Sequence, residues 1–166
     1  MAATASAIPT TEYPHRLFVY GTLKRGFYNH RVYLQHAEQS KAAKYLGTAT
    51  TCNRYSMKIV GERCVPALFE EPAETAIQGE VYAITDSVLE AMDILEGVAS
   101  GHYFRKRHDV ILEEERISCF VYCQNHKEGV DLSNEPSYSD YTEELHTKYS
   151  PRSKVPNSSI LNLLMK

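Results

Sequence analysis

Residues 16–26 read RLFVYGTLKRG, a strand pattern that is followed directly by a glycine-rich turn. The first five residues have the β-branched and aromatic content of a buried strand. Gly21 and Gly26 then let the backbone turn sharply and approach a ligand closely, because glycine has no Cβ. Such a turn can direct several backbone N–H groups into one concavity, which suits a carboxylate or a phosphate. The stretch therefore predicts a binding loop after a strand, or else an ordinary turn between two elements.

Lys24 and Arg25 within this loop also leave two interpretations open. They can attract an anionic substrate, or they can simply be solvated at the surface. Nucleotide binding is not predicted, because Phe27 follows Gly26 where a phosphate-binding loop requires lysine. The glycine spacing also differs from that of a dinucleotide-binding fingerprint.

The chain has 166 residues, of which 43% are hydrophobic and 23% are charged, as is usual for one soluble globular domain. Its net charge of -3 lacks the basic excess that a nucleic-acid or anionic-membrane surface requires. No stretch approaches the length of a membrane span. We expect a cytoplasmic monomer with no nucleic-acid or membrane partner.

The two ends of the chain differ in composition from its middle. Residues 1–13 are small and polar, without the apolar core of a signal peptide or the arginines of a transit peptide. We interpret 1–13 as a flexible tail and 14–156 as a single domain, whose polar segment 124–156 extends around it as an arm. Residues 157–166 contain five large apolar side chains and predict a short C-terminal helix or tail.

Four cysteines, Cys52, Cys64, Cys119 and Cys123, raise the question of a disulfide or a zinc site. They form no C-x-x-C pair, and no histidine lies at zinc-ligand spacing from them. Without a secretory segment a reducing compartment is expected, which favours free thiols. We therefore expect no metal site.

Seven runs rich in strand-forming residues are separated by polar or glycine-containing turns. They cover residues 16–20, 44–51, 56–60, 65–69, 78–84, 103–112 and 117–123. A weak helical pattern at 29–39 and a clear helix near 86–96 do not alternate regularly with these runs, which argues against a doubly wound parallel sheet. The pattern predicts an α+β domain of about six or seven short strands that form a closed or half-closed barrel.

The clear helix has recognisable ends and one apolar side. Ser87 and Glu90 have the spacing of a capping box, and Gly97 suits the left-handed position just past a helix. At 100° per residue the following side chains fall on one side: Val88, Leu89, Met92 and Leu95.

Glu96 lies within this apolar stripe, four residues after Met92 and seven after Leu89. A charged group is normally excluded there, and burial would raise its pKa towards neutrality, where a general base or acid works best. Glu96 is therefore a candidate catalytic residue. Two alternatives remain: the side chain reaches solvent at the helix end, or it pairs with Arg105 or Arg107.

The loop and the helix end belong to a longer series of short motifs. In order along the chain these are YGTLKRG at 20–26, NHR at 29–31, GEVYA at 79–83, LE at 95–96, Tyr103 with Arg105, CFVY at 119–122 and YSPR at 149–152. Their order and spacing resemble the γ-glutamylcyclotransferase superfamily, and within it the γ-glutamylaminecyclotransferases and the avirulence-induced-gene-2-like proteins. The resemblance covers residues 16–152.

This resemblance implies a small mixed β-barrel with peripheral helices and no cofactor. It implies an intramolecular aminolysis, in which the α-amino group of a γ-glutamyl substrate attacks its own γ-carbonyl, expels an amine and closes 5-oxoproline. It assigns Glu96 as general base and then general acid. It also implies that the glutamyl moiety is bound by the backbone of a loop made of Tyr20, Gly21, Thr22 and Leu23. Tyr103 and Tyr122 are further candidates for the binding pocket, or are ordinary strand aromatics.

The leading functional hypothesis is a γ-glutamylamine cyclotransferase, with γ-glutamyl-ε-lysine as the type substrate. A second hypothesis keeps the reaction and changes the substrate to another γ-glutamyl amino acid or conjugate. A third, from a different class, is a non-catalytic ligand-binding module on the same fold. Glu96 on the apolar face favours an enzyme.

Overall fold

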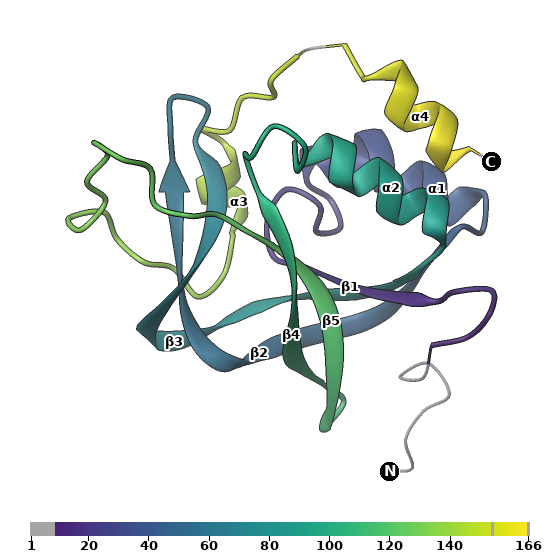
Figure 1. The fold of residues 1–166 in the computed structure, drawn as a ribbon, viewed down its shortest axis with the longest axis horizontal. Helices are drawn as coiled ribbons and strands as arrows, with labels where there is room; N and C mark the ends of the chain where they lie inside the picture. Colours follow the sequence, from purple (N-terminus) through teal and green to yellow (C-terminus); the bar gives the residue numbers. More distant parts are fainter. Residues whose placement is uncertain (1–8, 154, 166) are drawn as a thin grey trace.

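A closed five-stranded barrel forms the centre of the protein. The structure is a computed structural model that describes residues 9–153 and 155–165, so residues 1–8 of the expected tail lie outside the described part. The strands are β1 (His15–Val19), β2 (Ala43–Val60), β3 (Val65–Ile84), β4 (Phe104–Leu112) and β5 (Glu115–Cys123). They follow the order β1-β3-β2-β4-β5 around the barrel (Figure 1). The barrel is mixed, because β1 is antiparallel to β3 and parallel to β5.

The expected count of six or seven strands is wrong because two strands are very long. β2 contains both of the runs predicted at 44–51 and 56–60, and β3 contains both of those at 65–69 and 78–84. The pairing of β2 with β3 shifts register at several points between Thr50 and Ser56. Such irregularities bend a strand without ending it, and their polar residues resemble a turn in sequence. The outer halves of β2 and β3 form a hairpin that extends beyond the barrel (Figure 1).

β1 is buried on both faces, which explains its uninterrupted apolar sequence. Leu17 and Val19 belong to a core between the barrel and the helices, whereas Phe18 belongs to the core that fills the barrel. Each of these three side chains is at most 3% exposed. The strand thus joins the two cores, and its end is held rigidly where the glycine loop begins.

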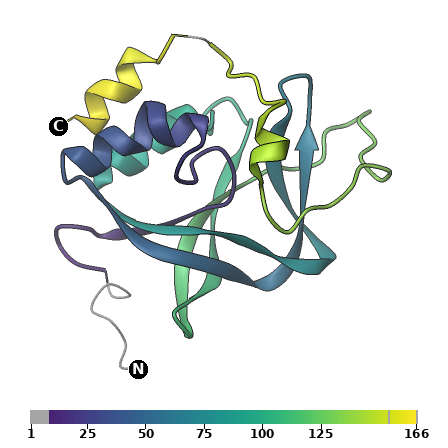
Figure 2. The ribbon, with the colours of Figure 1, turned by 180° about the vertical axis from the view of Figure 1, so that it is seen from behind.

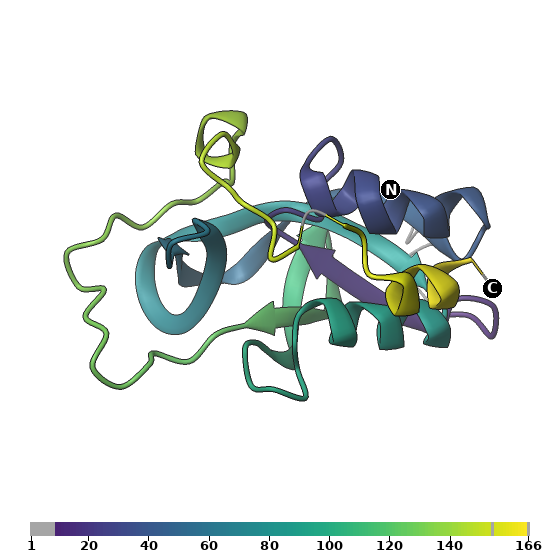
Figure 3. The same ribbon diagram turned by 90° about the horizontal axis from the view of Figure 1, so that it is seen from above.

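Helices cover one side of the barrel. They are η2 (His30–Leu34, a π-helix), α1 (Gln35–Gln39), α2 (Asp86–Leu95) and α4 (Ser158–Leu164). A short helix, α3 (Glu143–His146), lies apart from them beside the outer hairpin (Figure 1). Figure 3 shows α4 lying between α2 and the η2–α1 pair. The Ser40 hydroxyl donates to the carbonyl of Leu164 at 2.9 Å, which fixes the end of α4 on α1. Within the described part of the chain, every helix falls short of the length and apolar character needed to cross a membrane.

The polar segment after β5 runs around the outer hairpin before it returns to the helices (Figure 2). The Tyr138 N–H donates to the carbonyl of Met57 at 2.8 Å, which attaches the segment to β2. The Ser150 N–H donates to the carbonyl of Arg63 at 2.9 Å, at the tip of the hairpin. The segment therefore brings the hairpin tip and the C-terminal residues to the same place.

The N-terminus of α2 differs from the predicted capping box. Thr85 is the N-cap, and its hydroxyl accepts a hydrogen bond from the Val88 N–H at 3.3 Å, so Ser87 lies inside the first turn. The predicted helix end is confirmed, since Gly97 has a φ of +65°. A Cβ at Gly97 would also lie 2.6 Å from the ring of His102.

We expect Thr85→Ala to lower the free energy of unfolding by about 1 kcal/mol, because an N-terminal amide of α2 loses its acceptor. Ser87→Ala is the matched control and is expected to cost less than Thr85→Ala. Urea denaturation of both variants measures the difference. An equal or larger loss for Ser87→Ala would contradict the assignment of Thr85 as the cap.

Candidate active site

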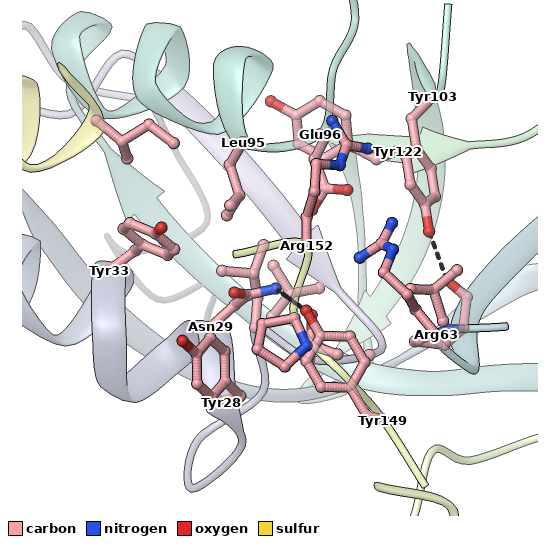
Figure 4. Close-up of a pocket in the computed structure, with 18 of the residues that line it drawn as sticks. Tyr28, Asn29, Tyr33, Arg63, Leu95, Glu96, Tyr103, Tyr122, Tyr149 and Arg152 are labelled. Atoms are coloured by element: carbon pink, nitrogen blue, oxygen red, sulfur yellow. Dashed lines mark hydrogen bonds between the residues drawn. The ribbon is translucent and has the colours of Figure 1, made fainter. Parts of the chain in front are cut away.

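A cavity of about 180 Å³ lies where β1, α2, the hairpin tip and the C-terminal segment meet (Figure 4). This volume suits a small molecule rather than a macromolecule. Its inner end is closed by Phe18, Val19 and Tyr20, none of which is more than 6% exposed. Val155, which also lines the cavity, is 74% exposed, so the cavity opens beside the C-terminal segment.

All of the site residues expected from the sequence line this one cavity. They are Glu96, Tyr20, Gly21, Thr22, Leu23, Tyr103 and Tyr122. They come from the loop after β1, from the residue that follows α2, from the residue before β4 and from β5. The closure of the barrel brings these distant segments together.

Glu96 is the C-cap residue of α2 and the one acidic side chain among the described residues that line the cavity. In the described part of the chain its carboxyl group has no hydrogen-bond or ion-pair partner. Burial raises the pKa of this carboxyl group to about 7, because the charged form loses its hydration. The positive charges of Arg152 and Arg63 act in the opposite direction and lower it only in part. Near neutral pH the group can therefore both accept and release a proton.

The alternative pairing of Glu96 with Arg105 or Arg107 is not observed. Arg105 instead donates to Asp93 at 2.7 Å, and Arg107 lies over the ring of Phe120. Asp93 is a helix neighbour of Glu96 that also accepts a hydrogen bond from the Tyr122 hydroxyl. The carboxylate of Asp93 is thus bound by Arg105 and Tyr122, while that of Glu96 has no such partner among the described residues.

The three predicted tyrosines donate their hydroxyl protons to the protein itself. The Tyr20 hydroxyl donates to the carbonyl of Tyr122 at 2.7 Å and accepts from the Leu68 N–H at 3.0 Å. The Tyr103 hydroxyl donates to the carbonyl of Pro66, drawn as a dashed line in Figure 4, and the distance is 2.8 Å. Burial raises the pKa of Tyr20 well above its ordinary value, which keeps it neutral. These residues line the cavity as fixed rings and tie β1, β3 and β5 together around it.

The glycine loop is held close to the hairpin. A Cβ on Gly21 would lie 2.5 Å from the Cγ of Pro66, so only glycine fits there without movement. The Asn29 amide donates to the Thr22 hydroxyl at 2.7 Å and to the Tyr149 hydroxyl at 3.3 Å. Asn29, which the sequence motif contained without an evident role, therefore links the loop to the C-terminal segment.

Lys24 and Arg25 differ in their surroundings. Neither residue lines the cavity. Lys24 is buried and pairs with Asp140 at 2.6 Å, and Arg25 lies over the ring of Tyr45. Lys24 is therefore a buried, paired residue outside the cavity, whereas Arg25 is exposed at the surface, as the second interpretation expected.

Positive charge reaches the cavity from two arginines that sequence reasoning missed. Arg63 comes from the hairpin tip and Arg152 from the C-terminal segment (Figure 4). Arg152 belongs to the YSPR motif at 149–152, which was a signal for family resemblance but not for a place in the site. Arg63 carried no local signal, because its position depends on how the long hairpin bends.

The described residues were expected to hold no metal ion. Among the described residues, no group of three or more His, Cys, Asp or Glu side chains is arranged to hold a metal ion. The four cysteines are free, and two of them, Cys119 and Cys123, are buried in the barrel.

Comparisons with known proteins agree with this fold. The family model described as "Gamma-glutamyl cyclotransferase, AIG2-like" matches residues 17–143. A putative γ-glutamylcyclotransferase of Methanocaldococcus jannaschii is 32% identical over 126 residues, which cover 75% of this chain and 96% of that protein. The γ-glutamylaminecyclotransferase of Homo sapiens is 34% identical over 152 residues, which cover 82% of this chain and 96% of that protein.

A crystal structure of an AIG2-like protein from Mus musculus has the same fold, with a TM-score of 0.72 and 30% sequence identity. The match covers 85% of this chain and 98% of that one. The chain therefore belongs to the AIG2-like γ-glutamyl cyclotransferase family, and it is an enzyme of this class.

Proposed function

We propose that this enzyme acts on γ-glutamyl amines, with γ-glutamyl-ε-lysine as the type substrate, and releases 5-oxoproline and the free amine. The observation that carries the proposal is the Glu96 carboxyl group. It is unpartnered among the described residues, has a pKa of about 7 and shares a cavity with the glycine loop. Relatives from Bos taurus and Homo sapiens that are named γ-glutamylaminecyclotransferase support an amine as the leaving group.

The reaction moves two protons from the attacking nitrogen to the leaving nitrogen. The α-amino group of the substrate is an ammonium ion at neutral pH, and the Glu96 carboxylate takes a proton from it. The neutral amine then attacks the γ-carbonyl carbon, forming the new C–N bond of the five-membered ring. When the bond to the leaving amine breaks, protonated Glu96 gives its proton to that nitrogen. The regenerated carboxylate then takes the second proton from the ring nitrogen and passes it to the released amine, which leaves as an ammonium ion. A carboxyl group with a pKa near 7 is suited to both steps.

The glycine loop supplies the positioning that this cyclisation requires. Among the described residues, no hydrogen-bond partner is found for the backbone N–H groups of Gly21, Thr22 and Leu23. We assign these groups to the glutamyl carboxylate and carbonyl oxygens. Holding both ends of the glutamyl chain favours the folded conformer in which amine and carbonyl meet.

The activity is tested by incubating the protein with γ-glutamyl-ε-lysine, γ-glutamyl-alanine and glutathione, and measuring 5-oxoproline. We expect release from γ-glutamyl-ε-lysine. Release from another member of the panel alone would keep the reaction but replace the substrate. No release from any member would contradict the proposed function.

The pH dependence of the reaction follows from the raised pKa of Glu96. Because the free enzyme must carry the Glu96 carboxylate, kcat/KM is expected to fall about tenfold per pH unit below a midpoint near 7. Initial rates at low substrate concentration between pH 5 and pH 9 measure this limb. A midpoint near 4.5, the ordinary value for glutamate, would contradict the proton-transfer role.

A further inference from the structure

We propose that Arg63 and Arg152 bind a carboxylate carried by the leaving amine, so that the enzyme prefers γ-glutamyl derivatives of amino acids over those of simple alkylamines. This inference rests on the proposed function and names the substrate class more closely. It predicts that the carboxylate of the lysine in γ-glutamyl-ε-lysine is recognised directly.

The first argument is that these two cations, which lie close enough to Glu96 to lower its pKa, form no ion pair with it or with any other described residue. In the part of the chain that the structure describes, neither guanidinium forms an ion pair or a hydrogen bond. Other basic side chains near the site are paired, such as Lys24 with Asp140 and Arg105 with Asp93. The chain as a whole has a net charge of -3, so the two arginines do not reflect a general excess of basic residues. Two unpaired guanidinium groups lining one cavity favour an anionic ligand.

The second argument is their position. Ser150 and Arg63 share a backbone hydrogen bond of 2.9 Å, which joins the hairpin tip to the segment that carries Arg152. Arg152 is exposed and Arg63 is partly buried, so both lie towards the open side of the cavity. The glycine loop and the ring of Tyr20 lie at the closed end. With the glutamyl half held by the loop, the leaving amine points towards the arginines.

The third argument is chemical. A guanidinium presents a planar set of N–H donors that can bind a carboxylate through two parallel hydrogen bonds. γ-Glutamyl-ε-lysine offers such a carboxylate beyond the scissile bond. γ-Glutamylcadaverine is identical except that this carboxylate is missing, and it would leave both cations unpaired. γ-Glutamyl-alanine and γ-glutamylethylamine form a second pair, in which the carboxylate is close to the scissile nitrogen.

The experiment measures kcat/KM for both members of each pair with the wild type, Arg63→Met, Arg152→Met and the double variant. In at least one pair the wild type is expected to favour the carboxylate-bearing member by about 10- to 100-fold. Each single substitution should reduce this ratio, and the double variant should bring it close to one. Arg152→Lys should keep part of the preference for the carboxylate-bearing substrate. Arg116→Met is the matched control, because Arg116 pairs with Asp109 outside the cavity, and it should leave the ratio unchanged.

The ratio is the appropriate readout because the arginines also act on Glu96. Their charges lower the pKa of Glu96, so removing either one raises it and moves the acid limb of the rate profile to higher pH. That change affects both members of a substrate pair alike and cancels in the ratio. Binding of the same pairs to Glu96→Gln, measured by calorimetry, gives the discrimination without turnover.

Two results would overturn the inference. One is a ratio near one in the wild type for both pairs. The other is an equal loss for both members in the double variant, which would mean that the arginines bind the glutamyl carboxylate common to all substrates. Preferential binding to Glu96→Gln without any 5-oxoproline release by the wild type would instead overturn the proposed function and keep the carboxylate site.

Discussion

Glu96→Gln is expected to lower kcat/KM for 5-oxoproline release by about 10²- to 10⁴-fold, the usual size of a general acid–base contribution. The amide has nearly the same size and shape as the carboxyl group but can neither take nor return the proton. Because Glu96 has no hydrogen-bond or ion-pair partner among the described residues, the substitution breaks no such contact. Glu90→Gln, on the exposed side of the same helix, is the matched control and should retain full activity.

The free energy of unfolding of Glu96→Gln shows whether this variant is correctly folded. The pKa of Glu96 is raised in the folded protein, so its favourable contribution to stability is complete below pH 4.5 and is lost as the pH rises through about 7. At pH 8.5 Glu96→Gln is therefore expected to be more stable than the wild type, by at most about 3 kcal/mol. At pH 4 the two should be similar. Urea denaturation at both pH values measures this, and full activity or a stability loss at both would contradict the account.

Gly21→Ala is expected to lower kcat/KM by about 10²-fold, because a small displacement of catalytic groups can cost this much. The added methyl group would lie 2.5 Å from the Cγ of Pro66, whose ring has little freedom to move. The carbonyl of Pro66 is also held by the Tyr103 hydroxyl at 2.8 Å. The loop must therefore shift, and its backbone N–H groups with it. Steady-state kinetics with γ-glutamyl-ε-lysine measures the loss.

Gly26→Ala is the control for Gly21→Ala, since it adds the same methyl group to the same loop. No atom lies within 4 Å of a Cβ at Gly26, but its φ of +91° strains any other residue. This variant should lose about 1 kcal/mol or more of stability and keep more of its activity than Gly21→Ala. The reverse order of activities would mean that contact with Pro66 does not position the loop.

Much of the barrel could be predicted from local patterns, because each buried run of strand-forming residues lies in a strand of the structure. The number of strands could not be predicted in this way. The polar residues between Thr50 and Ser56 interrupt the apolar pattern as a turn does, yet they are irregularities within β2. Only the partner strand decides between a turn and a bulge. The helix begins at Asp86, as expected, but its cap was assigned to the wrong residue, since Thr85 and Ser87 are both acceptable caps and the backbone selects Thr85.

Site residues could be predicted from the sequence where their own local pattern marks them. Gly21 follows a buried strand, and Glu96 ends an amphipathic helix on its apolar side, so each could be singled out from its own neighbourhood. Lys24 was open to misinterpretation because its partner, Asp140, lies 116 residues away in the sequence. Arg63 could not be found, since it reaches the cavity only through the bent hairpin and the returning C-terminal segment.

The central claim is that Glu96 is a carboxyl group that titrates near neutral pH inside the glutamyl site. The most direct measurement is an NMR titration of the glutamate side-chain carboxyl carbons in protein labelled with ¹³C at that position. The Glu96 resonance is assigned by its absence from Glu96→Gln. A midpoint near pH 7 is the predicted result. A midpoint near 4.5 would show that Glu96 is fully ionised at neutral pH, and it would contradict the account.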